Sequence, residues 1–440
     1  MVSETVGEDS DNLYLFDRQT TEMKTISKPD RRANHTNAGI AWTPDSQGFY
    51  FASNVDRNFA ALMHYSLADG FTLKQAADMD VERVLLCGTN NEYLLWSLNN
   101  GGYSQLQGLH LTSDQTITAP ALPEGVLSVD CRAGNAQAAI TLRNYQTPGD
   151  IYVWQLSSGQ TKRAFAANLA GLAVDSLIKP QSITMPARDG VTLQGLLYLP
   201  TVKTEGKPPV LFRVHGGPTA QSRPGFSAAT QYLLGKGIAV FLPNVRGSTG
   251  FGHTYVTLDD RENRLDSIRD LVDMLKYLER DGRVDTQRAA VAGGSYGGYA
   301  VNAVLANFPG HFKAGVSLFG VADWVTALQI ASPGLKASDR IEYGDITEQK
   351  WLDFYTEQSP IRQADQINVP VLYSHGVMDP RIDIYETEVM VKTLRENGVE
   401  APFIRIPDEG HGWRKLPNQL FYYRQEAAFL ERVLIAPEAK

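Results

Sequence analysis

The sequence predicts an α/β protein preceded by an all-β region, and two patterns support this. Residues 1–178 contain short alternating or apolar runs separated by turn residues, which is typical of all-β domains. Residues 179–440 alternate strand-like apolar runs with helical patterns, which indicates a mostly parallel sheet covered by helices. A chain of 440 residues is long enough for both domains.

Composition narrows the class of protein. The chain is 43% hydrophobic and 20% charged, as in ordinary soluble globular proteins. A formal net charge of −8 argues against a nucleic-acid partner or an anionic membrane surface. The sequence contains no window of about 18 apolar residues, so no membrane span is expected. The first residues are polar and acidic, unlike a signal peptide, so we expect a cytoplasmic location.

The all-β region shows a repeating unit. Strand-like runs that end in a turn at Leu67, Leu111 and Leu156 are spaced 44 and 45 residues apart. A period of about 45 residues with four strands per unit is typical of β-propeller blades. The turn at 42–46, Trp-Thr-Pro-Asp-Ser, resembles a turn that is common in such blades. A generic β-sandwich is the alternative.

The number of blades is unusual. Residues 13–27 resemble the closing half of a blade and three further units follow, so residues 1–178 predict a partial propeller of about three and a half blades. Propellers typically have four to eight blades. We therefore expect the chain to begin inside a propeller, as a truncated or processed form. Unpaired strand edges favour pairing with another chain, so we also expect a homo-oligomer formed through these edges.

The two cysteines, Cys87 and Cys131, lie far apart in strand-like segments. We expect them to be two buried free thiols, with a disulfide as the alternative. The sequence has no C-x-x-C or H-E-x-x-H pattern, so we predict no metal site and no cofactor.

In residues 179–440, eight strand-like runs can be counted. They are separated by helical patterns that include residues 263–279 and 420–434, whereas residues 324–362 read as helix or loop and are a candidate cap. The eight runs cover 182–186, 191–199, 210–214, 238–242, 289–292, 314–319, 370–374 and 402–406. Eight strands with a glycine-flanked serine after the fifth match the plan of an α/β-hydrolase.

That serine is Ser295, in the stretch Gly-Gly-Ser-Tyr-Gly-Gly-Tyr at 293–299. A strand, a glycine-flanked serine and a helix form the setting of a nucleophile elbow, a strained turn that accepts only small flanking residues. The turn exposes the hydroxyl and places the next backbone N–H, that of Tyr296, at the positive end of the helix. A glycine-rich turn with an incidental serine is the alternative.

A serine nucleophile needs a base, and the base needs an orienting acid. In this fold the chain order is serine, acid, histidine. His411 lies in a glycine-lined loop between the last strand and the last helix, where the base belongs. His375 ends a strand and is expected to be a structural histidine that packs under the site. Asp379 follows the preceding strand and is the candidate acid, with Asp383 as the alternative.

A second oxyanion donor is expected from the loop His-Gly-Gly-Pro at 215–218, which follows the third strand and is similar to the oxyanion loop of esterases and lipases. We assign the backbone N–H of Gly217 to this role, beside that of Tyr296. The spacing of the glycine-rich run 247–252 matches neither the P-loop nor the dinucleotide-binding fingerprint, so nucleotide binding is not predicted.

Together these motifs resemble the prolyl oligopeptidase family of serine peptidases, particularly its acylaminoacyl-peptidase-like branch. The resemblance covers the whole second part and rests on the segments 215–218, 243–252, 293–299, 379–382 and 409–412. It implies Ser295 as nucleophile, Asp379 as orienting acid and His411 as base, with Gly217 and Tyr296 as oxyanion donors. Two departures stand out: Val245 replaces the usual tyrosine, and the propeller is about half the usual length.

Three functions remain open at this point. A serine peptidase acting on short or acylated peptides is favoured; a carboxylesterase using the same triad on small esters is the alternative. A non-catalytic scaffold built on the propeller is the third. Phe251, Phe319 and Trp324 are candidates for an apolar substrate pocket.

Overall fold

The computed structural model describes residues 1–7, 10–27, 36–132, 134–202 and 206–435. The chain forms two compact units, the first comprising residues 1–179, 223–227 and 249–256 and the second the remainder. The predicted domain boundary between residues 178 and 179 stays a proposal.

The first unit is built from β-sheets. Within the described residues it holds one three-stranded and three four-stranded antiparallel sheets, each made of consecutive strands. The three-stranded sheet contains β1 (Val2–Gly7), β2 (Ser10–Phe16) and β3 (Met23–Ser27); the next contains β4 (Asn37–Trp42), β5 (Gly48–Ser53), β6 (Ala61–Ser66) and β7 (Gly70–Gln75). The last two contain β8 (Asp80–Cys87), β9 (Tyr93–Asn100), β10 (Tyr103–His110) and β11 (Gln115–Thr116), then β12 (Val126–Cys131), β13 (Gln137–Asn144), β14 (Thr147–Gln155) and β15 (Thr161–Phe165).

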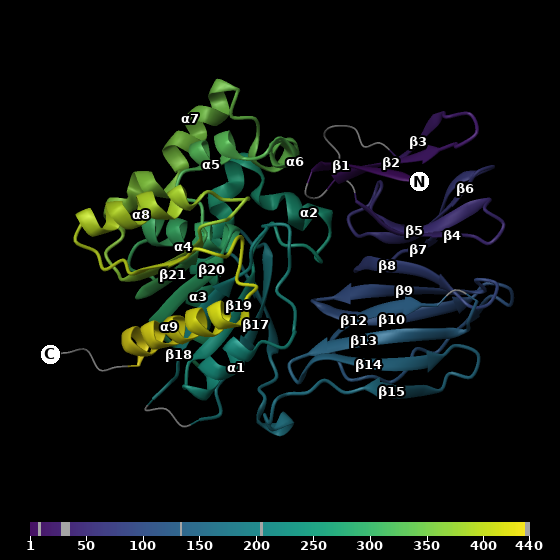
Figure 1. Cartoon of the computed structure of the whole chain (residues 1–440), viewed down its shortest axis with the longest axis horizontal. Coiled ribbons are helices and arrows are strands. Elements are labelled where there is room, and N and C mark those ends of the chain that lie inside the picture. Colours follow the sequence, from purple (N-terminus) through teal and green to yellow (C-terminus); the bar gives the residue numbers. More distant parts are fainter. Residues whose placement is uncertain (8–9, 28–35, 133, 203–205, 436–440) are drawn as a thin grey trace. The chain divides into compact units, whose positions relative to one another are not determined.

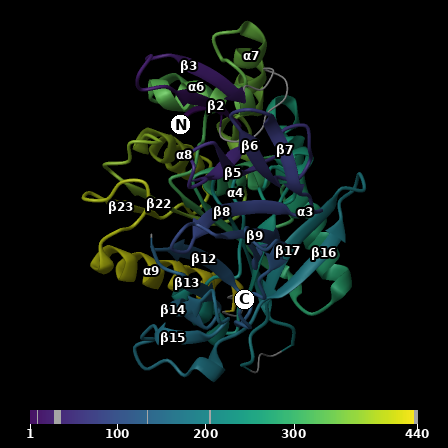
Figure 2. The same cartoon turned by 90° about the vertical axis from the view of Figure 1, so that its right-hand side faces the viewer.

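The four sheets follow one another in chain order, as Figures 1 and 2 show. An apolar core lies between each sheet and the next: Leu13 and Phe49 belong to the first, Ala52 and Leu94 to the second, and Leu95 and Trp154 to the third. Strand residues alternate between these cores and the other face of their sheet, as the pleat requires. This arrangement of four-stranded units is a propeller-type one, as the sequence period predicted.

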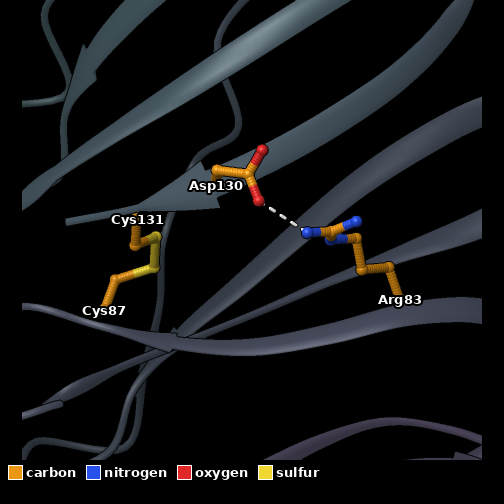
Figure 3. The surroundings of a disulfide bond; sticks show 4 residues. All are labelled: Arg83, Cys87, Asp130 and Cys131. Atoms are coloured by element: carbon orange, nitrogen blue, oxygen red, sulfur yellow. Dashed lines mark hydrogen bonds and ion pairs between the residues drawn. A yellow bond between two sulfur atoms is a disulfide. The ribbon is translucent and has the colours of Figure 1, made fainter. Parts of the chain in front are cut away.

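The two cysteines correct one prediction, because Cys87 and Cys131 form a disulfide and are not free thiols. Cys87 ends β8 and Cys131 ends β12, and the packing of the two sheets brings their Cα atoms to 5.5 Å. An ion pair between Arg83 and Asp130, 2.6 Å long, joins the same two strands (Figure 3). The seam between these sheets is therefore covalently closed.

The second unit is organised around an eight-stranded sheet in the order β16-β17-β19-β18-β20-β21-β22-β23. The pairs β16–β17 and β17–β19 are antiparallel, and all other neighbours are parallel. The strands are β16 (Gln181–Pro186), β17 (Thr192–Tyr198), β18 (Pro209–Val214), β19 (Ala239–Asn244), β20 (Asp285–Gly294), β21 (Ala314–Leu318), β22 (Val371–Gly376) and β23 (Phe403–Ile406). This confirms the predicted α/β-hydrolase class.

Helices cover the sheet. Helices α4 and α8 lie on one side of β20 and β21, and α9 lies on the other (Figure 1). Residues 324–362, expected as helix or loop, form three helices and part of a 3₁₀ segment. The helices are α1 (Ala228–Gly235), α3 (Arg264–Asp281), α4 (Tyr296–Asn307), α5 (Trp324–Ile330), α6 (Pro333–Tyr343), α7 (Gln349–Gln358), α8 (Ile384–Glu396) and α9 (Leu416–Leu434), with the short α2 (His253–Val256) in the first unit.

Among the described residues, no helix has the length and apolar character needed to cross a bilayer.

Candidate active site

Ser295 occupies the turn between β20 and α4. Its φ of 59° and ψ of −123° place it in a region that residues other than glycine seldom adopt and that costs about 1–3 kcal/mol. Ser295 is also the N-cap residue of α4, so Tyr296 is the first residue of the helix. Its N–H has no acceptor within the helix, because the first turn of any α-helix leaves such groups unpaired.

The glycines around Ser295 allow this turn to form. A Cβ atom on Gly297 would lie 2.4 Å from the carbonyl oxygen of Val214, and one on Gly293 would lie 2.5 Å from the carbonyl of Gly297. Both distances are shorter than side chains tolerate, so the helix can approach the sheet this closely only with glycine at both positions.

Asp379 and His411 come from the loops that follow β22 and β23. The Asp379 carboxylate is fully buried and accepts hydrogen bonds from the backbone N–H groups of Arg381 (2.8 Å) and Ile382 (3.1 Å). Its Oδ2 atom lies 2.7 Å from Nδ1 of His411. A carboxylate can only accept, so His411 donates through Nδ1, which leaves Nε2 as the basic nitrogen.

Burial would raise the pKa of Asp379, but hydrogen bonds from His375 and His411 and from the backbone outweigh it and lower that pKa below its ordinary value. The carboxylate is therefore ionised at neutral pH and can stabilise a protonated imidazole.

His375 lies beside this pair. Its buried ring places Nε2 3.4 Å from Oδ2 of Asp379 and 3.1 Å from the carbonyl oxygen of Ile382, while Nδ1 lies 2.8 Å from the hydroxyl of Thr387. His375 thus helps to hold the Asp379 carboxylate in position. The alternative acid, Asp383, instead caps α8 by accepting the N–H of Tyr385.

The ring of Phe319 connects the serine turn with the histidine loop. It packs on the His411 ring with centroids 4.6 Å apart, and a Cβ atom on Gly294, next to Ser295, would lie 2.9 Å from it. Among the residues that the structure describes, no hydrogen bond joins the Ser295 hydroxyl to His411. Catalytic hydrogen bonds are often long without substrate and tighten when it binds.

The loop His215–Pro218 lies against the serine turn. A Cβ atom on Gly216 would lie 3.3 Å from Cβ and 3.9 Å from Oγ of Ser295. The His215 ring fixes this loop, because Nδ1 lies 2.8 Å from the carbonyl oxygen of Gly216 and Nε2 lies 2.9 Å from the hydroxyl of Ser248. Burial lowers the pKa of His215, which favours its neutral form.

The three predicted pocket residues are not all brought together. Phe319 contacts His411, as described above. Trp324 is buried against the rings of Tyr299 and Tyr343, with centroids 4.9 and 4.5 Å away. Phe251 belongs to the first unit, where it packs with Tyr255. In the described part of the chain no group of side chains has the composition and spacing to hold a metal ion.

The chain is similar to known proteins in sequence and in fold. The sequence profile of the prolyl oligopeptidase family matches residues 224–436. Dipeptidyl aminopeptidase BIII of Pseudoxanthomonas mexicana is 28% identical over 415 residues, which cover 89% of this chain and 59% of that protein. Acylamino-acid-releasing enzyme 1 of Oryza sativa subsp. japonica is 25% identical over 240 residues, covering 52% of this chain and 30% of that enzyme.

Solved structures share the fold. The crystal structure of puromycin hydrolase superposes with a TM-score of 0.85 at 20% identity, over 96% of this chain and 64% of that chain. Pyrococcus horikoshii acylaminoacyl peptidase superposes with a TM-score of 0.77, also at 20% identity, over 98% of this chain and 67% of that chain. The chain thus spans about three fifths of the dipeptidyl aminopeptidase that it matches.

Proposed function

We propose that this chain is a serine hydrolase that cleaves peptide or acyl-peptide bonds through an acyl-enzyme on Ser295, since residues 224–436 match the sequence profile of the prolyl oligopeptidase family. The observation that carries the proposal is the buried Asp379 carboxylate, 2.7 Å from Nδ1 of His411. It fixes the tautomer in which Nε2 accepts a proton, as a serine nucleophile requires.

The proposed reaction has two halves. In the first, His411 Nε2 takes the Ser295 proton while Oγ attacks the substrate carbonyl carbon, and the imidazolium then protonates the leaving amine. In the second, His411 activates a water molecule that attacks the acyl-serine and releases the acid. Asp379 stays ionised throughout and stabilises the imidazolium.

The negative charge on the tetrahedral oxygen requires donors that are already in place. We assign this role to the backbone N–H groups of Tyr296 and Gly217. Tyr296 begins α4, whose positive end favours an anion, and the Gly216–Gly217 loop lies against Ser295. Losing one such donor typically costs about 10²–10³-fold in kcat.

Labelling with a fluorophosphonate tests the nucleophile. The native protein should be labelled at one serine, and Ser295→Ala should abolish labelling while circular dichroism stays unchanged. A native protein that resists labelling would support a non-catalytic scaffold and contradict the proposal.

The leaving group distinguishes the two catalytic functions. A peptidase should turn over acyl-amino-acid and peptidyl anilides, and Ser295→Ala should lose that activity. Turnover of p-nitrophenyl acyl esters alone would identify a carboxylesterase instead, because an ester has the better leaving group and needs less substrate anchoring.

We also propose that the chain forms a homo-oligomer through propeller edges. The edge strand β15 is exposed at every residue, and its Phe165 side chain is half exposed. Exposed edges favour pairing between chains. Light scattering at high protein concentration should show more than one copy, and a monomer would contradict this proposal.

A further inference from the structure

The residue that follows the nucleophile has a buried hydroxyl. Tyr296 is 2% exposed, and its hydroxyl oxygen lies 2.6 Å from Oγ of Ser267 and 3.4 Å from Oδ2 of Asp259. Ser267 lies on α3, and Asp259 lies in the segment just before it. The first turn of α4 is therefore connected through a side chain to the neighbouring helix.

Asp259 is one member of a fully buried charged cluster. Its Oδ2 atom accepts a hydrogen bond from Nη1 of Arg264, and both side chains are 1% exposed. The other nitrogen, Nη2, lies 2.9 Å from Oε1 of Glu342 on α6. The guanidinium also lies over the rings of Tyr343 and Tyr296, 4.5 and 5.5 Å from their centroids.

Asp259 also lies against the loop that contains Gly247 and Ser248. A Cβ atom on Gly247 would lie 2.3 Å from Oδ1 and 2.6 Å from Oδ2 of Asp259, and Gly247 has a φ of +94°. The next residue, Ser248, is the one whose hydroxyl holds the His215 ring and with it the loop of Gly216 and Gly217. The carboxylate thus lies between the supports of the two proposed oxyanion donors.

A buried ion pair is weak evidence for stability, because removing two charges from water costs about as much as their attraction returns. An apolar pair would fill the same space at least as well. A carboxylate at this place does something that an apolar residue cannot: its Oδ2 atom accepts hydrogen bonds from both the Tyr296 hydroxyl and the Arg264 guanidinium.

We propose that Asp259, held in place by Arg264, is a positioning residue for the oxyanion hole. Asp259 sets the position of the first turn of α4 relative to the loop of Gly247 and Ser248. Asp259 acts through Tyr296 and through the glycine loop, and not on the substrate. The inference rests on the proposed function, since it concerns the same acyl-transfer site.

A double-mutant cycle tests the connection. Asp259→Asn removes the charge with little change in shape, and Tyr296→Phe removes the hydroxyl but keeps the ring. Each should lower kcat for an active substrate by about 10–100-fold, less than the loss of a whole donor, with KM changed by less than about threefold. The losses should not multiply in the double variant, because residues in one network are coupled.

The matched control is Asp150→Asn. Asp150 is buried on β14 of the first unit, outside the proposed active site, and pairs with Arg163 of β15 at 2.5 Å. It should lower the melting temperature as Asp259→Asn does but leave kcat unchanged. All rates are divided by the fraction of sites that a fluorophosphonate titrates, so loss of folded protein is not counted as loss of catalysis.

The rates of these variants decide whether Asp259 acts on the oxyanion hole. Unchanged kcat in Tyr296→Phe, or losses that multiply in the double variant, would overturn the inference and leave the proposed function intact. If Asp259→Asn does not fold, Tyr296→Phe and Arg264→Lys decide alone, and kcat within twofold of native in either variant would overturn the inference. A native protein that is neither labelled nor active would overturn the proposed function and this inference with it.

Discussion

His411 donates through Nδ1 to Oδ2 of Asp379 across 2.7 Å, and the carboxylate is wholly removed from solvent. Asp379→Asn should therefore reduce kcat by about 10⁴-fold, because an amide can donate to the ring and favours the wrong tautomer. Steady-state rates with a peptidyl anilide, at equal amounts of folded protein, would measure the loss.

Asp383→Asn is the control for this substitution. Asp383 caps α8 through the N–H of Tyr385 and does not orient the histidine, so its variant should keep kcat within about twofold and lose about 1 kcal/mol of stability at most. The opposite ranking of the two variants would assign the acid to Asp383.

The lowered pKa of Asp379 predicts a pH dependence of stability. The folded-state pKa lies below the unfolded value, which is about 3.9 for aspartate. The ionised group therefore stabilises the fold above that value, and its contribution is lost as the pH falls below about 4 toward the folded-state pKa.

Urea unfolding between pH 3 and 7 would measure this effect. The stability difference between the native protein and Asp379→Asn should shrink as the pH falls below about 4, because the asparagine does not titrate. A difference that stays constant over the whole range would rule out this linkage.

Local sequence signals were sufficient for much of the fold. The strand before Ser295, the glycines beside it and the helix after it are neighbours in the chain, so their pattern predicted the turn. The eight strands of the second sheet were predicted for the same reason. The predicted triad residues share one edge of that sheet, because parallel strands bring their following loops together.

Contacts between distant elements could not be predicted in this way. The 3.4 Å distance between His375 Nε2 and Asp379 Oδ2 depends on the conformation of the loop after β22, which the sequence pattern does not specify. The disulfide depends on the packing of two whole sheets, which a separation of 44 residues does not reveal. Residues 223–227 and 249–256 join the first unit although the chain around them belongs to the second.

The conformation of Ser295 predicts a stability difference between two inactive variants. Ser295→Gly can adopt a φ of 59° without strain, whereas Ser295→Ala cannot. Relief of about 1–3 kcal/mol of strain should exceed the entropic cost of glycine, which is about 0.5–1 kcal/mol. Ser295→Gly should therefore unfold at a higher urea concentration than Ser295→Ala; an equal or lower midpoint would show that the turn is unstrained.

Close packing beneath the turn predicts that Gly297→Ala is damaging. The added methyl group would lie 2.4 Å from the carbonyl oxygen of Val214, so α4 must move away from β18. We expect a loss of about 1–3 kcal/mol and a lower labelling rate at Ser295. Gly235→Ala is the matched control, because nothing lies within 4 Å of its Cβ position. Equal behaviour of the two variants would contradict the packing argument.

The disulfide between Cys87 and Cys131 predicts a local response to reduction. It closes a loop with a sequence separation of 44, and restricting the unfolded chain in this way is worth about 4 kcal/mol. Reduction, or replacement of both cysteines by serine, should therefore speed hydrogen exchange in β8 and β12. Strand β20 in the second unit serves as the internal control and should exchange at the same rate before and after.

Arg83→Ala removes only the exposed ion pair across the same seam and should cost at most about 1 kcal/mol. If exchange in β8 and β12 is unchanged after reduction, the apolar core between the two sheets, and not the disulfide, holds the seam together.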